Sequence, residues 1–225
     1  MSSSLAAGHR QRFTVQALNG QDLGRSPLPS AVAGVALRAD DALLIVDLQR
    51  DFLPGGALAV RGGEAVVARV NACIERFVAQ GLPVYASRDW HPLRHCSFDD
   101  AGGPWPPHCV AGTVGAAFAP GLKLPDDVRL VSKATTPSRD AYSAFSGTDL
   151  HGRLRAQHVL RLFVAGLATD YCVQSTVLDA LTLGYHVVVL GDAVAAIDAK
   201  PGDGDAALAR MLAAGAVMAS SDGLH

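Results

Sequence analysis

The sequence predicts a three-layer α/β/α sandwich built on a six-stranded parallel sheet. Short apolar runs alternate along the chain with segments whose apolar residues recur at helical spacing, which is the pattern of repeated β-α-β units. Several of the apolar runs are nearly continuous, as in strands that are buried on both faces. Helices on both sides of a parallel sheet provide that burial.

The first β-α-β unit occupies residues 42–86. Apolar runs at residues 42–46 and 83–86 predict two strands. Between these runs, apolar residues recur at helical spacing and predict a helix: Val66, Val67, Val70, Ile74, Phe77 and Val78.

The later part of the chain repeats this alternation. Apolar runs predict four more strands, at residues 128–131, 159–164, 186–190 and 216–219. Helical spacing predicts two more helices, at residues 170–183 and 205–213. The segment 91–125 is rich in Gly, Pro and His, and it is longer than a compact domain tolerates as an idle loop. We expect this loop to be functional.

The folded domain is predicted to span residues 41–225. Residues 1–40 mix Ser, Gly, Pro and Gln without a sustained period, so we expect a loosely ordered N-terminal extension. Its first part carries Arg10 and Arg12 and no acidic residue, which is a faint similarity to an organelle transit peptide. The simpler interpretation is a loose tail or an arm of a homo-oligomer.

The overall composition excludes several classes of partner. With 18% charged residues and a formal net charge of −2, the chain lacks the positive field that nucleic acid or an anionic membrane surface requires. No apolar run reaches the length of a membrane span, and the N-terminus lacks the order of a secretory signal. Four unevenly spaced cysteines indicate free thiols in a reducing compartment. We therefore expect a cytoplasmic protein with neither a nucleic-acid nor a membrane partner.

Chemically active side chains follow four of the predicted strands. Ligands of an open parallel sheet bind beyond the carboxyl ends of its strands. Four strands lead to one such residue each: Asp47, Asp89, Lys133 and, after a Gly-Leu-Ala-Thr-Asp turn, Cys172. Taken alone, each is more often a loop cap, a solvated charge or a small core residue. Their coincidence at one edge of the sheet favours an active site.

Cys172 is the candidate nucleophile. It lies in the first turn of a predicted helix, where free N–H groups and the helix dipole lower a thiol pKa and offer an oxyanion hole. An ordinary aspartate is a poor base for a thiol, because its pKa is about 4.6 units lower. We expect burial to raise the pKa of Asp47 while Lys133 stabilises the thiolate, so that the three residues act as one unit.

A second cluster combines one carboxylate with two imidazoles. Asp89 and His91 are two positions apart at an extended strand end, so their side chains point the same way. A stiff Trp-Pro-Pro segment leads to His108. This ligand set suits Zn, Fe or Mn, and three ligands leave positions open for water and substrate, as in a catalytic metal site.

Two other interpretations of these histidines remain open. They can be loop histidines that bond backbone carbonyl groups, and spacing alone does not separate this role from metal binding. A rival ligand set would give a closed structural zinc site, although the spacing is not that of any common zinc knuckle: Cys96 and Cys109 with His95 and His108.

Three aromatic residues lie close to these motifs in the sequence. Phe52, Trp105 and Tyr142 can line a flat pocket for a small ring, although an aromatic side chain is more often part of a core. Because only 6% of the residues are aromatic, their placement beside the motifs favours the pocket.

Five segments of the chain form one set: VDLQRDF (46–52), SRDWHP (87–92), WPPHCVAGT (105–113), AYSAF (141–145) after Lys133, and GLATDYCV (166–173). In this order they resemble the nicotinamidase (pyrazinamidase) branch of the isochorismatase-like cysteine hydrolases. The resemblance covers the chain from about residue 41 to its end, and five motifs together are much more specific than any one. The family fold is a six-stranded parallel sheet flanked by helices, which agrees with the predicted elements.

The resemblance implies an enzyme of NAD salvage that hydrolyses nicotinamide to nicotinate and ammonia and also accepts pyrazinamide. It implies that the pyridine nitrogen approaches a divalent metal ion while the ring stacks near Phe52 and Trp105. It also implies an oxyanion hole made by the N–H groups of Ala168 and Cys172, with a cis peptide after Leu167. The implied triad and metal ligands are the two clusters above: Asp47, Lys133 and Cys172, and Asp89, His91 and His108.

Three competing interpretations concern the same residues. Another hydrolase of the superfamily would act on isochorismate, N-carbamoylsarcosine or a ureido acid, but those branches generally lack the Asp-x-His…His set. A metal-binding protein without activity is disfavoured by the intact triad. A redox-sensing protein would need a second cysteine beside Cys172, and none is near in sequence, although Cys96 or Cys109 can approach in space. The extension of residues 1–40 departs from the family pattern and has no assigned role.

Overall fold

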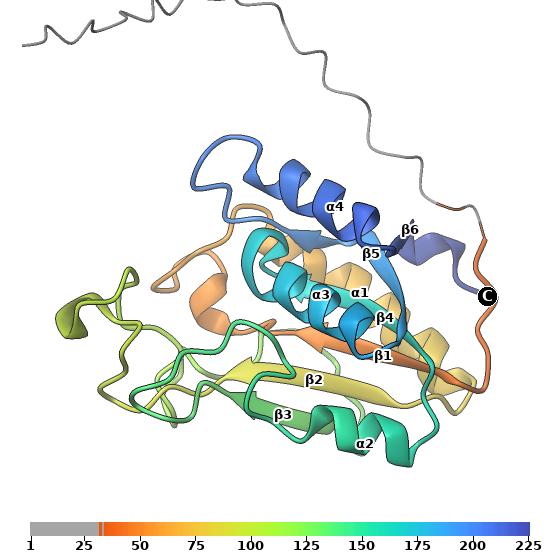
Figure 1. Ribbon diagram of the computed structural model, residues 1–225, viewed down its shortest axis with the longest axis horizontal. Coiled ribbons are helices and arrows are strands. Elements are labelled where there is room, and N and C mark those ends of the chain that lie inside the picture. The colour runs from red at the N-terminus through yellow and green to blue at the C-terminus, as the bar shows by residue number, and fades with distance from the viewer. Residues whose placement is uncertain (1–31, 33) are drawn as a thin grey trace, which may run out of the picture.

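Figure 1 shows the computed structural model of the chain, which describes residue 32 and residues 34–225. A six-stranded sheet forms the middle layer, and helices cover both of its faces. The strands lie in the order β3-β2-β1-β4-β5-β6, and every pair of neighbours is parallel. The predicted fold class is confirmed.

Each of the six predicted strands overlaps an observed one. The strands are β1 (Asp41–Val46), β2 (Val84–Asp89), β3 (Arg129–Lys133), β4 (Arg161–Leu167), β5 (His186–Ala195) and β6 (Val217–Ala219). The α-helices are α1 (Gly63–Ala79), α2 (Leu150–Ala156), α3 (Gln174–Thr182) and α4 (Asp203–Ala213).

The two faces of the sheet each carry a hydrophobic core. Alternate residues of a strand point to opposite faces, so Leu43 packs in the core that α1 covers and Leu44 packs in the other. On the first side, Val70 of α1 is fully buried. On the second side, α2, α3 and α4 cover the sheet, with Leu154 and Val177 among the buried residues. Burial on both faces explains why β1 is apolar throughout.

The structure differs from the predicted elements in three places. The helix α2 was not predicted, because seven residues that include Gly152 are too few to show a helical period. The predicted helix at 170–183 begins as a π-helical turn, Thr169–Val173, before α3. Strand β5 continues five residues beyond the predicted end, because a polar Gly-Asp pair interrupts its apolar run.

Most of the predicted N-terminal extension, residues 1–31 and 33, lies outside the described residues. The described remainder runs along the C-terminal part of the chain. The N–H of Val32 donates to the carbonyl of Met218 at 2.8 Å, and the N–H of Leu37 donates to the carbonyl of His225 at 2.8 Å. The end of the extension therefore pairs with the domain. No helix in the described part of the chain has the length and apolar character that a membrane crossing requires.

The order of the strands reverses between β1 and β4. These two strands run side by side up to the pair Val46 and Gly166, and β2 and β3 end at the pair Asp89 and Lys133. In open α/β sheets, ligands bind outside the carboxyl ends of the strands where the strand order reverses. The topology therefore brings the four strand-end residues to the place where a site is expected.

Candidate active site

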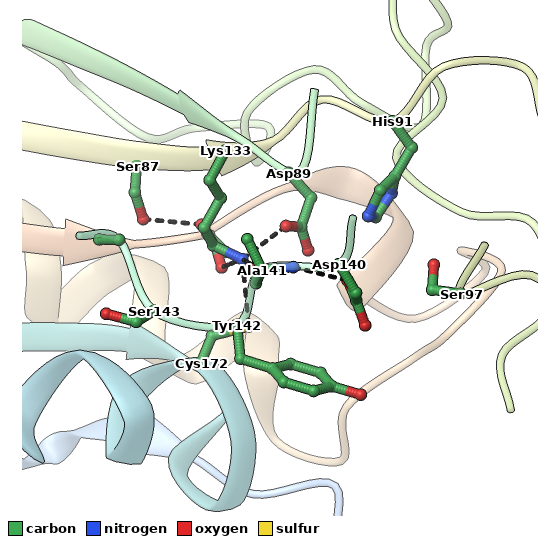
Figure 2. Close-up of polar contacts among 12 residues, drawn as sticks. Ser87, Asp89, His91, Ser97, Lys133, Asp140, Ala141, Tyr142, Ser143 and Cys172 are labelled. Carbon is green, nitrogen blue, oxygen red and sulfur yellow. Dashed lines mark hydrogen bonds and ion pairs between the residues drawn. The ribbon is translucent and has the colours of Figure 1, made fainter. Parts of the chain in front are cut away.

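Lys133 lies at the centre of the first cluster (Figure 2). Its ammonium nitrogen is 3.0 Å from Asp47 Oδ2, 2.5 Å from Asp89 Oδ1 and 3.4 Å from Cys172 Sγ. The same group donates to the carbonyl oxygen of Ala141 at 2.8 Å. All four charged or thiol side chains are buried. The structure thus brings together the strand-end residues that the sequence singled out.

Asp47 is held as a buried carboxylate at the end of β1. The Ser87 hydroxyl donates to its Oδ1 at 2.7 Å, while Oδ2 faces Lys133 as an ion pair and has no hydrogen bond among the described residues. Burial raises the pKa of Asp47 to about 6, although the charge of Lys133 acts in the opposite direction. The direction agrees with the prediction. A carboxylate with this pKa can accept a proton near neutral pH.

Cys172 differs from the prediction in its protonation. The expected lowering of the thiol pKa is wrong, because burial raises the pKa of Cys172 well above its usual value. The charge of Lys133 lowers that pKa, but the charges of Asp47 and Asp89 raise it. The raised pKa favours the protonated thiol, so we expect the thiolate to form by proton transfer to a nearby base. One oxygen of Asp47 lies within 4.8 Å of the sulfur.

The backbone around Cys172 has an unusual course. The peptide bond between Leu167 and Ala168 is cis, as the family resemblance implied. The carbonyl of Ala168 accepts from the N–H groups of Tyr171 and Val173, each at 3.1 Å. These bonds fold the π-helical turn that carries the thiol to the end of β4.

Asp89, His91 and His108 offer ligand atoms that all lie within 4.8 Å of one another, and all three side chains are buried. Nδ1 of His91 bonds the carbonyl of His108 at 2.9 Å, and Nδ1 of His108 bonds the carbonyl of Pro106 at 2.8 Å. A carbonyl only accepts, so each Nδ1 carries the proton and each Nε2 keeps a lone pair. This is the usual support of a metal-binding histidine. Burial also lowers the pKa of His91, which favours the neutral ring that binds metal. These residues therefore fit a divalent cation.

His95 lies beside this set but has no free nitrogen. The Ser97 N–H is 3.3 Å from its Nδ1, and its Nε2 bonds the Arg139 carbonyl at 3.0 Å. The ring packs on His91 with centroids 4.5 Å apart. His95, His91 and Asp140 are close enough to hold an ion, but His95 would first have to give up a hydrogen bond. Among the described residues, the alternative closed zinc set does not come together.

The three predicted pocket aromatics occupy two places. Phe52 packs against His108, with ring centroids 5.6 Å apart. The indole N–H of Trp105 donates to the Tyr142 hydroxyl at 2.9 Å, so these two side chains form one unit. Tyr171 joins that unit with its ring 5.0 Å from Trp105, edge to face. Tyr171 was not predicted, although its position next to Cys172 was a usable signal.

The isochorismatase domain family matches residues 41–223. This chain belongs to the isochorismatase family. A nicotinamidase of Escherichia coli (strain K12) is 41% identical over 198 residues, which cover 79% of this chain and 93% of that protein.

Two solved structures of related proteins share the fold of this chain. The pyrazinamidase of Pyrococcus horikoshii in complex with zinc is 48% identical with a TM-score of 0.78, and covers 80% of this chain and 99% of its own. PnC1 from L. infantum in complex with nicotinate is 39% identical with a TM-score of 0.80, and covers 85% of this chain and 98% of its own.

Two polar residues of this isochorismatase-family site were missed from the sequence. Ser87 bonds the carboxylate of Asp47, and Gln49 bonds the backbone of Asp89. Each lies two positions from a predicted site residue, Ser87 before Asp89 and Gln49 after Asp47. For Ser87, strand alternation was a usable signal, because residues two apart on a strand share a face.

Proposed function

We propose that this chain is a metal-dependent nicotinamidase, which hydrolyses nicotinamide to nicotinate and ammonia and also accepts pyrazinamide. One observation carries the proposal. The ammonium group of Lys133 contacts Asp47 and Cys172 on one side and Asp89, a member of the metal set, on the other. The buried ammonium group of Lys133 is thus common to a cysteine hydrolase triad and a metal site. The nicotinamidase and pyrazinamidase relatives support the substrate class.

The first half of the reaction forms a thioester on Cys172. Asp47 takes the thiol proton as sulfur attacks the carboxamide carbon, and Lys133 stabilises the negative charge on sulfur. The N–H groups of Ala168 and Cys172 hold the oxyanion. Asp47 then gives its proton to the departing nitrogen, the C–N bond breaks, and ammonia leaves.

The second half hydrolyses the thioester. Asp47, again ionised, takes a proton from water as the water oxygen attacks the thioester carbon. The C–S bond breaks, nicotinate leaves, and the proton on Asp47 returns to Cys172. The sum is one amide and one water consumed for one acid and one ammonia. Asp47 therefore needs a pKa between those of an ordinary carboxyl and a thiol, and its pKa of about 6 meets this need.

We propose that Asp89, His91 and His108 would hold the metal ion, as Zn, Fe or Mn. When bound, the ion supplies a Lewis acid for the ring nitrogen of the substrate and positive charge beside the carboxylates. Phe52 packs on His108 and would lie beside the ring. The unit of Trp105 and Tyr142 is proposed to line the pocket on the side of Cys172.

An amidase for a carbamoyl or ureido substrate is the alternative. His91 and His108 each present a free Nε2 and are therefore arranged to bind a metal ion. This arrangement disfavours the alternative, because a carbamoyl or ureido substrate has no ring nitrogen to place at a metal. We propose that the enzyme acts in NAD salvage in the cytoplasm, where its four free cysteines stay reduced. Residues 41–225 are proposed as the hydrolase domain and residues 1–40 as an extension.

Ammonia release tests the function directly. The purified, metal-loaded protein is given nicotinamide, pyrazinamide, N-carbamoylsarcosine or a ureido acid, and ammonia is measured with a coupled dehydrogenase. We expect turnover with the two aromatic amides, and none with the same protein carrying Cys172→Ala. Turnover with only the carbamoyl or ureido substrate would replace this function by the alternative.

A further inference from the structure

Gln49 is a fully buried amide between the two halves of the site. The chain leaves β1 at Asp47, which has a φ of 45°, and turns sharply so that the N–H of Gln49 donates to the Asp47 carbonyl at 2.8 Å. This turn directs the Gln49 side chain toward the end of β2, two residues after the proposed base.

The amide of Gln49 makes three hydrogen bonds. Its Nε2 donates to the carbonyl of Asp89 at 2.8 Å and to the carbonyl of Ala116 at 2.9 Å. Its Oε1 accepts from the N–H of Asp89 at 2.7 Å. Both amide hydrogens are used, and the side chain is bonded to both backbone polar groups of one residue.

The Gln49 side chain takes the place of strand pairing at Asp89, because β1 ends before it reaches that residue. The last paired residues of β1 and β2 are Ile45 and Ala86, and the backbone bond from Asp47 to Ser87 is the final one on this side. Beyond that point, Asp89 has no backbone of β1 beside it. The Gln49 side chain supplies the donor and the acceptor that the strand no longer provides, so it continues the ladder by one step.

The backbone of Asp89 is therefore held from both sides. On the other side, Asp89 pairs with Lys133 of β3, and the N–H of Trp90 donates to the Lys133 carbonyl at 3.1 Å. The carboxylate must serve two partners, because Oδ1 lies 2.5 Å from the Lys133 ammonium while the same group belongs to the metal set. A rotation of the Asp89 backbone would move it away from at least one of them.

We propose that Gln49 is a positioning residue, which orients Asp89 so that one carboxylate serves both the Lys133 ion pair and the metal ion. The inference rests on the proposed function, since it takes Asp89 as a metal ligand. All three hydrogen bonds of the Gln49 side chain go to backbone groups, so we assign it to neither the triad nor the metal set. Its side chain acts only through the backbone of Asp89 and, by its third bond, through the loop that contains Ala116.

The test compares two matched amide-to-acid substitutions. Gln49→Glu keeps the shape but cannot donate, so a carboxylate would face the carbonyls of Asp89 and Ala116. Asn71→Asp is the control, because Asn71 also bonds two backbone groups, donating to the Gly121 carbonyl at 2.8 Å and accepting from the Lys123 N–H at 2.8 Å. Asn71 lies on α1, outside both clusters.

Zinc affinity is measured by competition with a chromophoric chelator, on samples that circular dichroism shows to be folded. We expect Q49E to raise the Kd for Zn²⁺ by about 10–100-fold, the usual effect of losing support behind a metal ligand. N71D should keep the wild-type Kd. The kcat of Q49E at saturating Zn²⁺ should also fall, because the contact of Asp89 with Lys133 is disturbed as well.

Each outcome decides one point. Folded Q49E with wild-type zinc affinity would overturn the proposal. If Q49E does not fold, Gln49→Met removes the same three bonds without adding charge, and wild-type affinity in folded Q49M is equally contrary. If neither Q49E nor Q49M folds while N71D does, Gln49 serves only the stability of the sheet, and the proposal fails. A wild-type protein whose zinc affinity does not depend on Asp89 would instead contradict the proposed function.

Discussion

Lys133 determines the electrostatics of the site at the scale of single residues. One buried ammonium faces the carboxylates of Asp47 and Asp89, so the cluster carries a negative charge when Cys172 is protonated. That charge and the burial explain why the thiol pKa is raised despite the nearby cation. A metal ion bound to Asp89 would offset the negative charge of that carboxylate. The metal set therefore bears on the nucleophile through Lys133, as well as on the substrate ring.

The pKa of Asp47 predicts the acid limb of the pH profile. The base must be ionised, and its pKa of about 6 lies above the ordinary 3.8, so kcat/KM should fall tenfold per pH unit below about pH 6. Between pH 3.8 and about 6, the folded protein binds a proton that the unfolded chain releases, so the contribution of Asp47 to stability decreases as the pH rises through this window.

The measurement is kcat/KM for nicotinamide from about pH 4.5 to 8, a range that brackets the pKa of Asp47, at each pH on protein that remains folded by circular dichroism. A profile that stays flat down to the acid end of this range would show that no buried carboxylate with this pKa acts as the base.

The site residues that carry charge or a thiol were predictable from the sequence, whereas two neutral polar residues, Ser87 and Gln49, were missed. Asp47, Lys133 and Cys172 follow strands, and a parallel sheet gathers strand ends at one edge. Gln49 acts on the backbone of Asp89, a contact that no spacing in the sequence shows. The protonation of Cys172 was also out of reach, because the degree of burial that raises its pKa depends on the folded packing.

At the scale of elements, the turn between β4 and α3 determines where the nucleophile lies. Gly166 has a φ of 115°, and a Cβ at this position would overlap the Val46 carbonyl oxygen of the neighbouring strand. Only glycine combines this backbone conformation with so close an approach. The next residues form the π-helical turn that carries Cys172. The close packing of β4 on β1 is therefore a condition for the geometry of the site.

Replacing Gly166 by Ala should destabilise the protein by about 2–3 kcal/mol, because the added Cβ meets backbone that cannot move freely. Gly152→Ala is the matched control, since Gly152 lies in α2, where an added methyl group would meet no other atom within 4 Å. It should be neutral or stabilising by about 0.5–1 kcal/mol. Urea unfolding measures both, and equal stability of G166A and wild type would contradict this account of the turn.

The elements themselves were largely predictable, and the exceptions have local causes. Strands were found because burial on both faces makes them apolar runs, as in β1. Helix α2 was missed because it is short. The π-helical turn before α3 was predicted as ordinary helix, since the apolar spacing is the same and only the hydrogen bonds differ. The family motifs indicated the site more sharply than any periodicity did.

At the scale of the whole molecule, the described end of the N-terminal segment closes one edge of the domain. The N–H groups of Val32, Val35 and Leu37 donate to carbonyls of the last eight residues, and Arg161 donates to the carbonyl of Ala36 at 2.8 Å. A partly buried ion pair joins the same Arg161 to Asp41 at 2.7 Å. Residues just before the boundary predicted at residue 41 therefore contact the domain that follows it.

Two truncations test this boundary. A chain that starts at residue 41 loses these hydrogen bonds and should be less stable by about 2–4 kcal/mol, whereas one that starts at residue 32 keeps them. Thermal unfolding of the two chains is compared in the same buffer. Identical melting temperatures would mean that the segment adds nothing to the domain.

The most direct test of the whole account is ammonia release from nicotinamide before and after metal removal. The protein is stripped with a chelator, dialysed, and assayed alone and with Zn²⁺, Mn²⁺ or Fe²⁺ added back, with the Asp89→Ala variant in parallel. We expect turnover to disappear on chelation, to return with metal in the wild type, and not to return in D89A. Full turnover by the stripped wild-type protein would contradict a metal-dependent nicotinamidase.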